Sequence, residues 1–198
     1  MGLPIIQFPQ DIVAMQELLW QVQPDLVIET GVARGGSVVF YASMLELIGG
    51  DGRVIGVDVD IRRHNRAAIE AHPMARRIDL VEGSSIDPAT LFRVGELARG
   101  RRRVLVTLDS SHTHQHVLRE LELYSSFVTP GSYLVVFDTC VEWTPSELIG
   151  ERPWGKGDNP WTAVRAFLRG TDRFVVDVAI AGKLQVTVCR DGFLRCVK

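Results

Sequence analysis

The stretch Asp25-Leu-Val-Ile-Glu-Thr-Gly-Val-Ala-Arg-Gly-Gly-Ser37 decides how the chain is predicted to fold. Its apolar first half is typical of a buried strand, its glycines predict a tight turn, and the apolar residues 38–48 predict a helix. Such a junction places backbone N–H groups and the positive end of a helix dipole at the carboxyl edge of a sheet. We expect a ligand with acceptor groups to bind there.

The spacing of the glycines distinguishes between nucleotide ligands. A dinucleotide site requires G-x-G-x-x-G, whereas Gly31, Gly35 and Gly36 form E-x-G-x-x-x-G-G, so an NAD oxidoreductase is disfavoured. Glu29, two residues before the first glycine, can accept a hydrogen bond from an ammonium group. Asp58 ends the next predicted strand, where a carboxylate can accept both hydroxyls of a ribose. Together these residues favour S-adenosylmethionine over NAD, and a tight turn without a ligand is the alternative.

Apolar segments of strand and helix type alternate through the rest of the chain. Helices are expected at residues 12–22 with Asp11 as the N-cap, and at 38–48, 61–71, 87–97, 115–124 and 162–168. Strands are expected around residue 27 and at 53–58, 78–81, 104–108 and 133–137, followed by a closing hairpin of 174–180 and 184–189 around Gly182-Lys183. This order predicts one α/β domain over residues 1–198, with a doubly wound, mostly parallel seven-stranded sheet and a C-terminal antiparallel hairpin.

Composition limits the partners and the cellular setting of the chain. The net charge of −2 gives no basic surface for nucleic acid, and no apolar run reaches membrane-spanning length. Three cysteines without C-x-x-C spacing indicate neither a disulfide framework nor a zinc site, so we expect a reduced cytoplasmic protein. The helix face with Leu18, Leu19 and Trp20 has two interpretations, a homo-oligomer contact and core packing.

A second group of polar residues follows the fourth and fifth predicted strands. Asp109 and Asp138 end these strands, and neighbouring parallel strands would bring both carboxylates to the ligand edge. Paired carboxylates suit Mg²⁺, which can acidify a substrate hydroxyl. His112, in D-S-S-H, is a candidate base. The alternative for either aspartate is a solvated strand end or a helix N-cap.

The segment 139–159 is a long predicted loop, rich in Trp, Pro and Gly. Loops of this length in a compact domain are usually functional or disordered. Trp143, Trp154 and Trp161 lie in or near it, where aromatic rings can stack on a sugar. A substrate lid and a set of core anchors are both consistent with this composition.

These motifs together resemble the cephalosporin hydroxylase family from about Pro4 to Phe167. Members of that family look like class I S-adenosylmethionine-dependent methyltransferases and are related to metal-dependent macrolide sugar O-methyltransferases. The most specific stretches are Ile28-Glu-Thr-Gly-Val-Ala-Arg-Gly-Gly-Ser37, Val57-Asp-Val-Asp-Ile61, Glu82-Gly-Ser-Ser85, Asp109-Ser-Ser-His112 and Arg152-Pro-Trp-Gly-Lys-Gly-Asp-Asn-Pro160.

The resemblance implies a Rossmann-like methyltransferase fold and assigns roles to individual residues. The donor S-adenosylmethionine would contact Glu29, Thr30, Gly31, Ala33, Gly35, Gly36, Ser37, Asp58, Ser84, Ser85 and Asp109, with the two serines near the adenine. Asp109 and Asp138 would bind Mg²⁺, and His112 would match the proposed base.

The resemblance also implies an activity, an O-methyltransferase acting on a hydroxyl of a small natural product, sugar or glycoside. The alternative is a non-catalytic donor-binding subunit that assists a partner enzyme. Two departures bear on these readings. Phe137 stands where metal-binding relatives typically have Glu, which removes a carboxylate. The N-terminal part is shorter than in longer relatives, so a more open pocket, or one completed by a neighbouring subunit, is expected.

Overall fold

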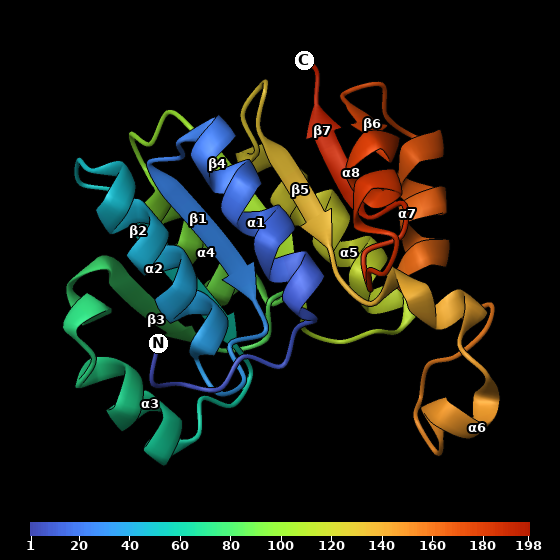
Figure 1. The fold of residues 1–198 in the computed structure, drawn as a ribbon, viewed down its shortest axis with the longest axis horizontal. Coiled ribbons are helices and arrows are strands. Elements are labelled where there is room, and N and C mark those ends of the chain that lie inside the picture. The colour runs from blue at the N-terminus through green and yellow to red at the C-terminus, as the bar shows by residue number, and fades with distance from the viewer.

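Seven strands form the centre of the structure, a computed structural model that describes residues 1–198 (Figure 1). They are β1 Leu26–Thr30, β2 Arg53–Asp58, β3 Ile78–Glu82, β4 Val104–Leu108, β5 Tyr133–Val136, β6 Phe174–Val176 and β7 Phe193–Cys196. Their order in the sheet is β3-β2-β1-β4-β5-β7-β6. β7 pairs antiparallel with both β5 and β6, and all other pairs of neighbouring strands are parallel. The predicted doubly wound, mostly parallel seven-stranded sheet is confirmed.

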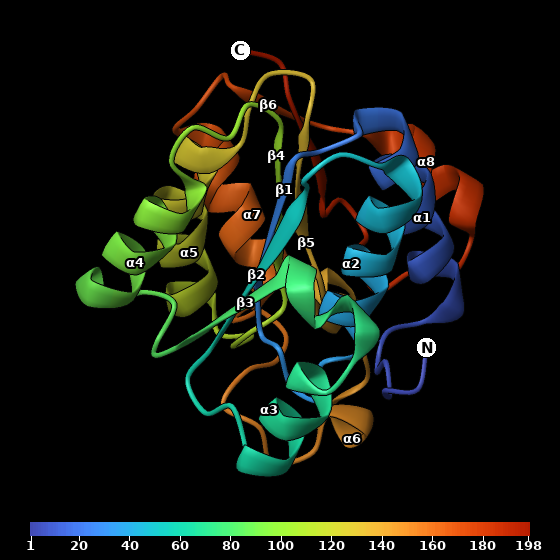
Figure 2. The ribbon, with the colours of Figure 1, turned by 90° about the vertical axis from the view of Figure 1, so that its left-hand side faces the viewer.

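Helices cover both faces of the sheet (Figure 2). One face carries α1 Pro9–Val22, α2 Gly36–Ile48 and α8 Val178–Leu184, and the other carries α4 Pro88–Ala98, α5 His114–Tyr124 and α7 Pro160–Arg169. The helices α3 Arg63–Glu70 and α6 Ser146–Ile149 lie toward the carboxyl edge of the sheet, as both views show. None of the helices has the length and apolar composition that crossing a membrane requires.

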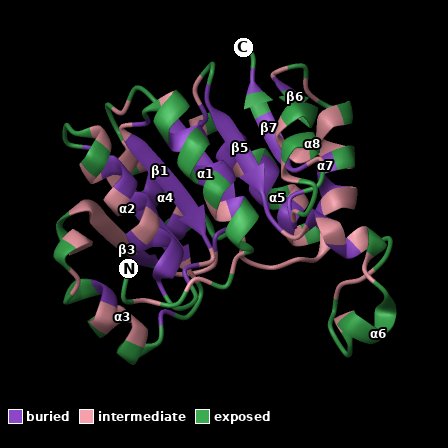
Figure 3. Ribbon diagram, viewed as in Figure 1, coloured by how far each residue is buried: buried purple, intermediate pink, exposed green.

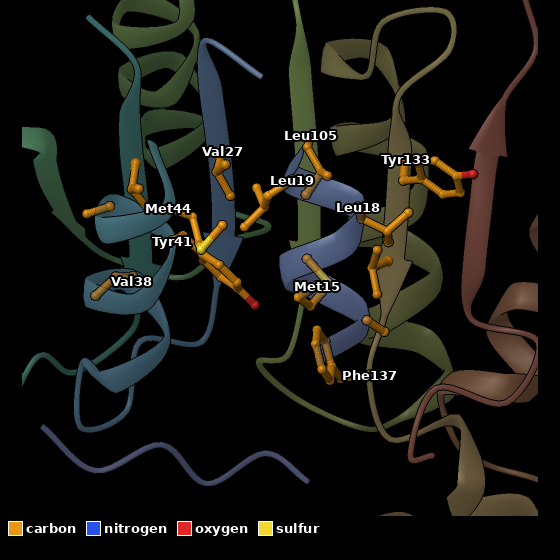
Figure 4. Close-up of a cluster of buried hydrophobic side chains, with 14 of the residues drawn as sticks. Met15, Leu18, Leu19, Val27, Val38, Tyr41, Met44, Leu105, Tyr133 and Phe137 are labelled. Atoms are coloured by element: carbon orange, nitrogen blue, oxygen red, sulfur yellow. The ribbon is translucent and has the colours of Figure 1, made fainter. Parts of the chain in front are cut away.

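The apolar core consists of two layers, one on each side of the sheet. The central strands β1 and β5 between these layers are buried (Figure 3). In the layer below α1, the side chains of Met15, Leu18 and Leu19 point toward the sheet and pack on its strands (Figure 4). Leu18 and Leu19 therefore belong to the core, as one of the two interpretations predicted. Trp20, on the opposite side of the same helix, is 55% exposed.

Strand register brings the candidate site residues to one edge of the sheet. Thr30 pairs with Val57 on one side and with Leu108 on the other, and Leu108 pairs with Val136. The next residues along each strand therefore lie side by side at the carboxyl edge: Gly31, Asp58, Asp109 and Phe137. Ligands bind at this edge in open α/β sheets.

The C-terminal hairpin was predicted with the wrong second strand. β6 does form, but its partner is β7, and the predicted strand 184–189 is instead the end of α8 and a loop. The carboxylate of Asp177 accepts a hydrogen bond from the Ala179 N–H and so caps α8. Ile180 and Leu184, four residues apart, then pack on the core from one helix face, which is helical rather than strand spacing.

The start of α1 also differs from the prediction. The helix begins at Pro9 with Phe8 as the N-cap, so Asp11 lies inside the first turn and is fully buried. Its carboxylate accepts hydrogen bonds from the Thr187 hydroxyl and from the Val188 N–H at 3.0 Å. Asp11 therefore ties the C-terminal loop to α1 rather than capping the helix.

Gly31 is expected to tolerate no side chain without a large loss of stability. Its φ is +93°, and a Cβ there would lie 2.0 Å from the Asp109 carbonyl oxygen. We expect Gly31→Ala to lower the free energy of unfolding by about 3 kcal/mol or more, measured by urea denaturation. Gly95→Ala is the control, because a Cβ in that helix meets nothing; it should stabilise the protein by about 1 kcal/mol. Equal effects of the two changes would contradict this account.

Candidate functional site

The turn after β1 is held by the carboxylate of Asp58. Its Oδ2 accepts hydrogen bonds from the backbone N–H groups of Val32 and Ala33, both at 2.9 Å, and its Oδ1 accepts one from Asp60. Ala33 and Gly35 adopt left-handed backbone conformations in this turn. Asp58 thus lies beside the glycine turn, and its carboxylate forms hydrogen bonds with that turn and with Asp60.

Glu29, at the carboxyl end of β1, is fully buried. The Ser37 hydroxyl donates a hydrogen bond to its Oε2 at 2.8 Å, while its Oε1 has no partner. Burial raises the pKa of Glu29 well above its usual range, Ser37 opposes this, and the charges of Asp109 and Asp58 add to it. A buried carboxyl group with a free oxygen is energetically costly unless a ligand supplies a hydrogen-bond donor.

Asp109, His112 and Asp138 come together at the ends of β4 and β5. One ligand atom from each lies within 4.8 Å of the others, a grouping that could hold a metal ion. Asp138 has a left-handed backbone, with φ of 54°, directly after β5. Burial raises the pKa of Asp109 well above its usual range, and the Asp138 charge adds to the shift. A cation between the two carboxylates would relieve this repulsion.

The ring of His112 is fixed on two sides. Its Nε2 lies 3.2 Å from Asp138 Oδ2, and the Trp154 ring meets it edge-on at a centroid distance of 4.8 Å. Burial lowers the pKa of His112 from its usual 6.5, although the neighbouring charges of Asp138 and Glu120 oppose this. The imidazole is therefore neutral at pH 7, the form that can accept a proton or bind a metal.

Two of the cavities that border the glycine turn have Gly31, Ala33 and Asp109 in their walls. The larger, of about 500 Å³, contains the Asp109, His112 and Asp138 side chains. The smaller, of about 200 Å³, lies on the other side of the turn. The predicted residues that line the larger cavity are Gly31, Ala33, Ser37, Asp109, His112 and Asp138, and those that line the smaller are Gly31, Ala33, Asp58, Ser84, Ser85 and Asp109. Neither cavity is lined by Glu29, Thr30, Gly35 or Gly36.

His116, which was not among the predicted site residues, lines the smaller cavity. Its Nε2 lies 3.1 Å from the Ser85 hydroxyl and 3.3 Å from the Ser110 hydroxyl. Ser110 in turn donates a hydrogen bond of 2.7 Å to the fully buried Glu120. The i, i+4 spacing of His116 and Glu120 on an amphipathic helix was the available sequence signal for this pair.

Sequence reasoning also missed Gln7, whose Nε2 donates a hydrogen bond of 3.1 Å to Asp109 Oδ2. The segment that carries it, Pro4–Phe8, lines the larger cavity. No periodicity marks this extended segment, and only Pro4 at its start and Pro9 just after its end set it apart. Phe137, in the position where a second carboxylate was expected, is 1% exposed and packs in the core.

The segment 139–159 contains a 3₁₀ turn at Thr139–Trp143 and α6, which stands away from the body of the molecule (Figure 1). Its tryptophans have different surroundings. Trp154 lines the larger cavity, whereas Trp143 stacks edge-on against Trp161 at 5.2 Å, and Trp161 donates a hydrogen bond to Asp191. Trp161 is thus an anchor, and Trp154 is the tryptophan that faces the site.

The fold is that of a Rossmann-like α/β protein, and the candidate site consists of two adjoining cavities at the carboxyl edge of its sheet. The sequence profile of the rhamnosyl O-methyltransferase/CmcI family matches residues 1–197. The chain belongs to this family, so the predicted family resemblance is confirmed.

Individual relatives give the same assignment. A rhamnosyl O-methyltransferase of Mycobacterium tuberculosis is 34% identical over 171 residues, which cover 84% of this chain and 64% of that protein. One from Mycobacterium leprae is 31% identical over 199 residues, with coverages of 98% and 81%. The chain thus spans just under two thirds of the length of the first of these relatives.

Solved structures of CmcI share the fold. An apo form superposes with a TM-score of 0.71 at 23% identity, covering 100% of this chain and 75% of that one. A form with Mg and SAM gives a TM-score of 0.67 at 21% identity, with the same coverages. The predicted methyltransferase-like fold is therefore confirmed.

Proposed function

We propose that this protein is an S-adenosylmethionine-dependent O-methyltransferase that acts on a hydroxyl group of a sugar or glycoside. The observation that carries the proposal is the cluster of Asp109, His112 and Asp138 on the wall of a cavity that adjoins the glycine turn. The turn would bind a nucleoside-bearing methyl donor, and the cluster would activate a hydroxyl group of the acceptor. Family membership and the rhamnosyl O-methyltransferase relatives support the same reaction class.

The residues around the turn fit the donor. Glu29 has a buried oxygen without a partner, which suits an ammonium group. The smaller cavity has a polar wall with Asp58 and the serines 84 and 85, which would hold the ribose and the adenine. S-Adenosylmethionine supplies a methyl group on a positively charged sulfur, and transfer to oxygen leaves S-adenosylhomocysteine. Solved relatives described with SAM or SAH support this choice of donor.

The cluster also fits Mg²⁺. Two carboxylates and one imidazole within 4.8 Å offer a mainly oxygen donor set, and a cation would reduce the repulsion between the charges of Asp109 and Asp138. Asp109 and Asp138 would bind the ion, with His112 beside them and water completing the shell. Mg²⁺ at this position would lower the pKa of an acceptor hydroxyl. Because Phe137 stands where relatives have the Glu of a Glu-Asp pair, this site has one carboxylate fewer. We therefore expect weaker metal binding than in those relatives.

The protein's own residues would orient the acceptor and receive its proton. A neutral His112, held by Asp138 and by the edge of Trp154, is the group able to accept that proton as the oxygen attacks. Holding oxygen and methyl carbon in line contributes much of the rate. Trp154 and Arg152, both at the cavity, offer an aromatic face and hydrogen-bond donors to a sugar.

The test is methyl transfer from labelled S-adenosylmethionine to a panel of rhamnosides and other glycosides, with Mg²⁺ or with EDTA. We expect product with at least one glycoside, and a fall of at least about tenfold in rate when EDTA removes the metal. Asp138→Asn should show the lowered rate even with Mg²⁺ present. Donor binding without methylation of any acceptor would instead favour the non-catalytic donor-binding subunit.

A further inference from the structure

The N-terminal segment Pro4–Phe8, here called the strap, runs across the site before α1 begins (Figure 1). All five of its residues line the larger cavity together with Gly31, Ser37 and Asp109. The strap lies directly on the glycine turn, because a Cβ on Gly36 would be 2.2 Å from the Pro4 carbonyl oxygen. Any ligand that rests on the turn therefore also meets the strap.

Gln7 is the strap residue that reaches the site's polar groups. Its Nε2 donates to Asp109 Oδ2 at 3.1 Å, which fixes the side-chain amide in one orientation. Its Oε1 is buried and has no hydrogen-bond partner. An amide held by its nitrogen and free at its oxygen presents an acceptor to whatever fills the space beside it.

Two other unpartnered polar atoms lie in the same neighbourhood, Glu29 Oε1 and the Tyr41 hydroxyl. Burial raises the pKa of Tyr41 well above its usual range, the charges of Glu29 and Asp109 add to this, and the nearby Gln7 amide opposes it. The three side chains come from the strap, from β1 and from α2, so three separate elements contribute unpaired polar atoms to this neighbourhood.

No cationic side chain forms a hydrogen bond or an ion pair with Glu29 or Asp109. Glu29 and Asp109 receive side-chain hydrogen bonds only from neutral groups, Ser37 and Gln7. Buried acceptors without donors each cost free energy, so a cluster of them indicates a ligand that brings donors and positive charge. An ammonium group, with three N–H donors and a unit charge, has this chemistry.

We propose that Gln7 is a donor-binding residue, whose Oε1 accepts a hydrogen bond from the ammonium group of an amino-acid-bearing nucleoside while its Nε2 stays on Asp109. The inference rests on the proposed function, since it names a further residue of the same donor site. It makes the strap a specificity element: the site prefers a nucleoside thioether with an amino-acid end over one without it.

The experiment compares two ligands by titration calorimetry. S-Adenosylhomocysteine carries the amino-acid end, and 5′-methylthioadenosine has the same nucleoside and sulfur without it. For Gln7→Leu we expect the affinity for S-adenosylhomocysteine to fall by roughly 10- to 100-fold, the range of a hydrogen bond to a charged group. The affinity for 5′-methylthioadenosine should stay within about twofold of the parent.

Gln10→Leu is the matched control, the same change three residues further on, where the side chain is exposed and contacts neither cavity. It should leave both affinities unchanged. Gln7→Met, of similar length and shape, serves if the leucine variant melts at a lower temperature than the parent. An equal loss for both ligands, or no loss for either, would overturn the assignment of Gln7.

The outcome with the unaltered protein separates this inference from the proposed function. If the parent binds 5′-methylthioadenosine as tightly as S-adenosylhomocysteine, the ammonium contact is absent and the inference fails while the nucleoside site stands. If the parent binds neither ligand, the proposed function fails and the inference falls with it.

Discussion

Replacing His112 by alanine is expected to lower the turnover of a glycoside acceptor by about 10²- to 10⁴-fold, the usual contribution of a general base. The affinity for S-adenosylhomocysteine should change by no more than about threefold, because His112 lines the acceptor side of the turn and not the smaller cavity. The measurements are steady-state methylation of an active glycoside and calorimetric titration of the donor product.

His72→Ala is the control for this change. The His72 ring contacts the Met1 carbonyl and the Met74 N–H and lies outside both cavities, so turnover should be unchanged. The pH profile gives a second readout. Because burial lowers the pKa of His112, parent activity should persist as the pH falls below 6.5 and be lost only at lower pH. Full turnover by His112→Ala would disprove the base assignment.

Replacing Glu29 by glutamine is expected to have opposite effects on stability and on donor binding. The glutamine can still accept the Ser37 hydrogen bond but no longer offers a carboxylate to an ammonium group. We expect the affinity for S-adenosylhomocysteine to fall by roughly 30- to 1,000-fold, the cost of losing one partner of a buried charge pair. The melting temperature of the ligand-free protein should rise, because a buried ionisable group is removed.

The stability difference should depend on pH in a defined direction. The folded state holds the Glu29 proton more tightly than the unfolded state, so parent stability falls as the pH rises above about 4.5 and stops falling above the folded-state pKa. Glu29→Gln lacks this loss. Its stability advantage should therefore grow between pH 4.5 and neutrality, in urea titrations at a series of pH values. An advantage that shrinks with rising pH would contradict the burial argument.

The regular part of the fold could be predicted because pattern and environment agree there. β4 is buried at every position and apolar at all but Thr107, as expected of a strand covered on both faces, and its predicted bounds match the structure. The hairpin prediction, with strands at 174–180 and 184–189, failed at residues 177–189, which form α8 and a loop. There the Asp177 cap and the core contacts of Ile180 and Leu184 favour a helix. These contacts outweigh the local strand propensity of the sequence.

The candidate site was predictable where its residues end strands. Gly31, Asp58, Asp109 and Asp138 share one edge because parallel strands in register end together, and a sequence reveals strand ends. The contribution of Gln7 was not predictable in this way. It depends on an extended segment crossing the edge of the sheet, a path that no periodicity encodes. Likewise, the contact of Trp154 with His112 joins residues far apart in sequence without a shared element.

The most direct test of the central claim is calorimetric titration of the purified protein with S-adenosylhomocysteine, with NAD⁺ as the comparison ligand. We predict saturable binding of about one S-adenosylhomocysteine per chain in the micromolar range, a binding free energy near −8 kcal/mol, and no saturable binding of NAD⁺. Absence of S-adenosylhomocysteine binding at about 1 mM, or tighter binding of NAD⁺, would contradict the assignment of the site.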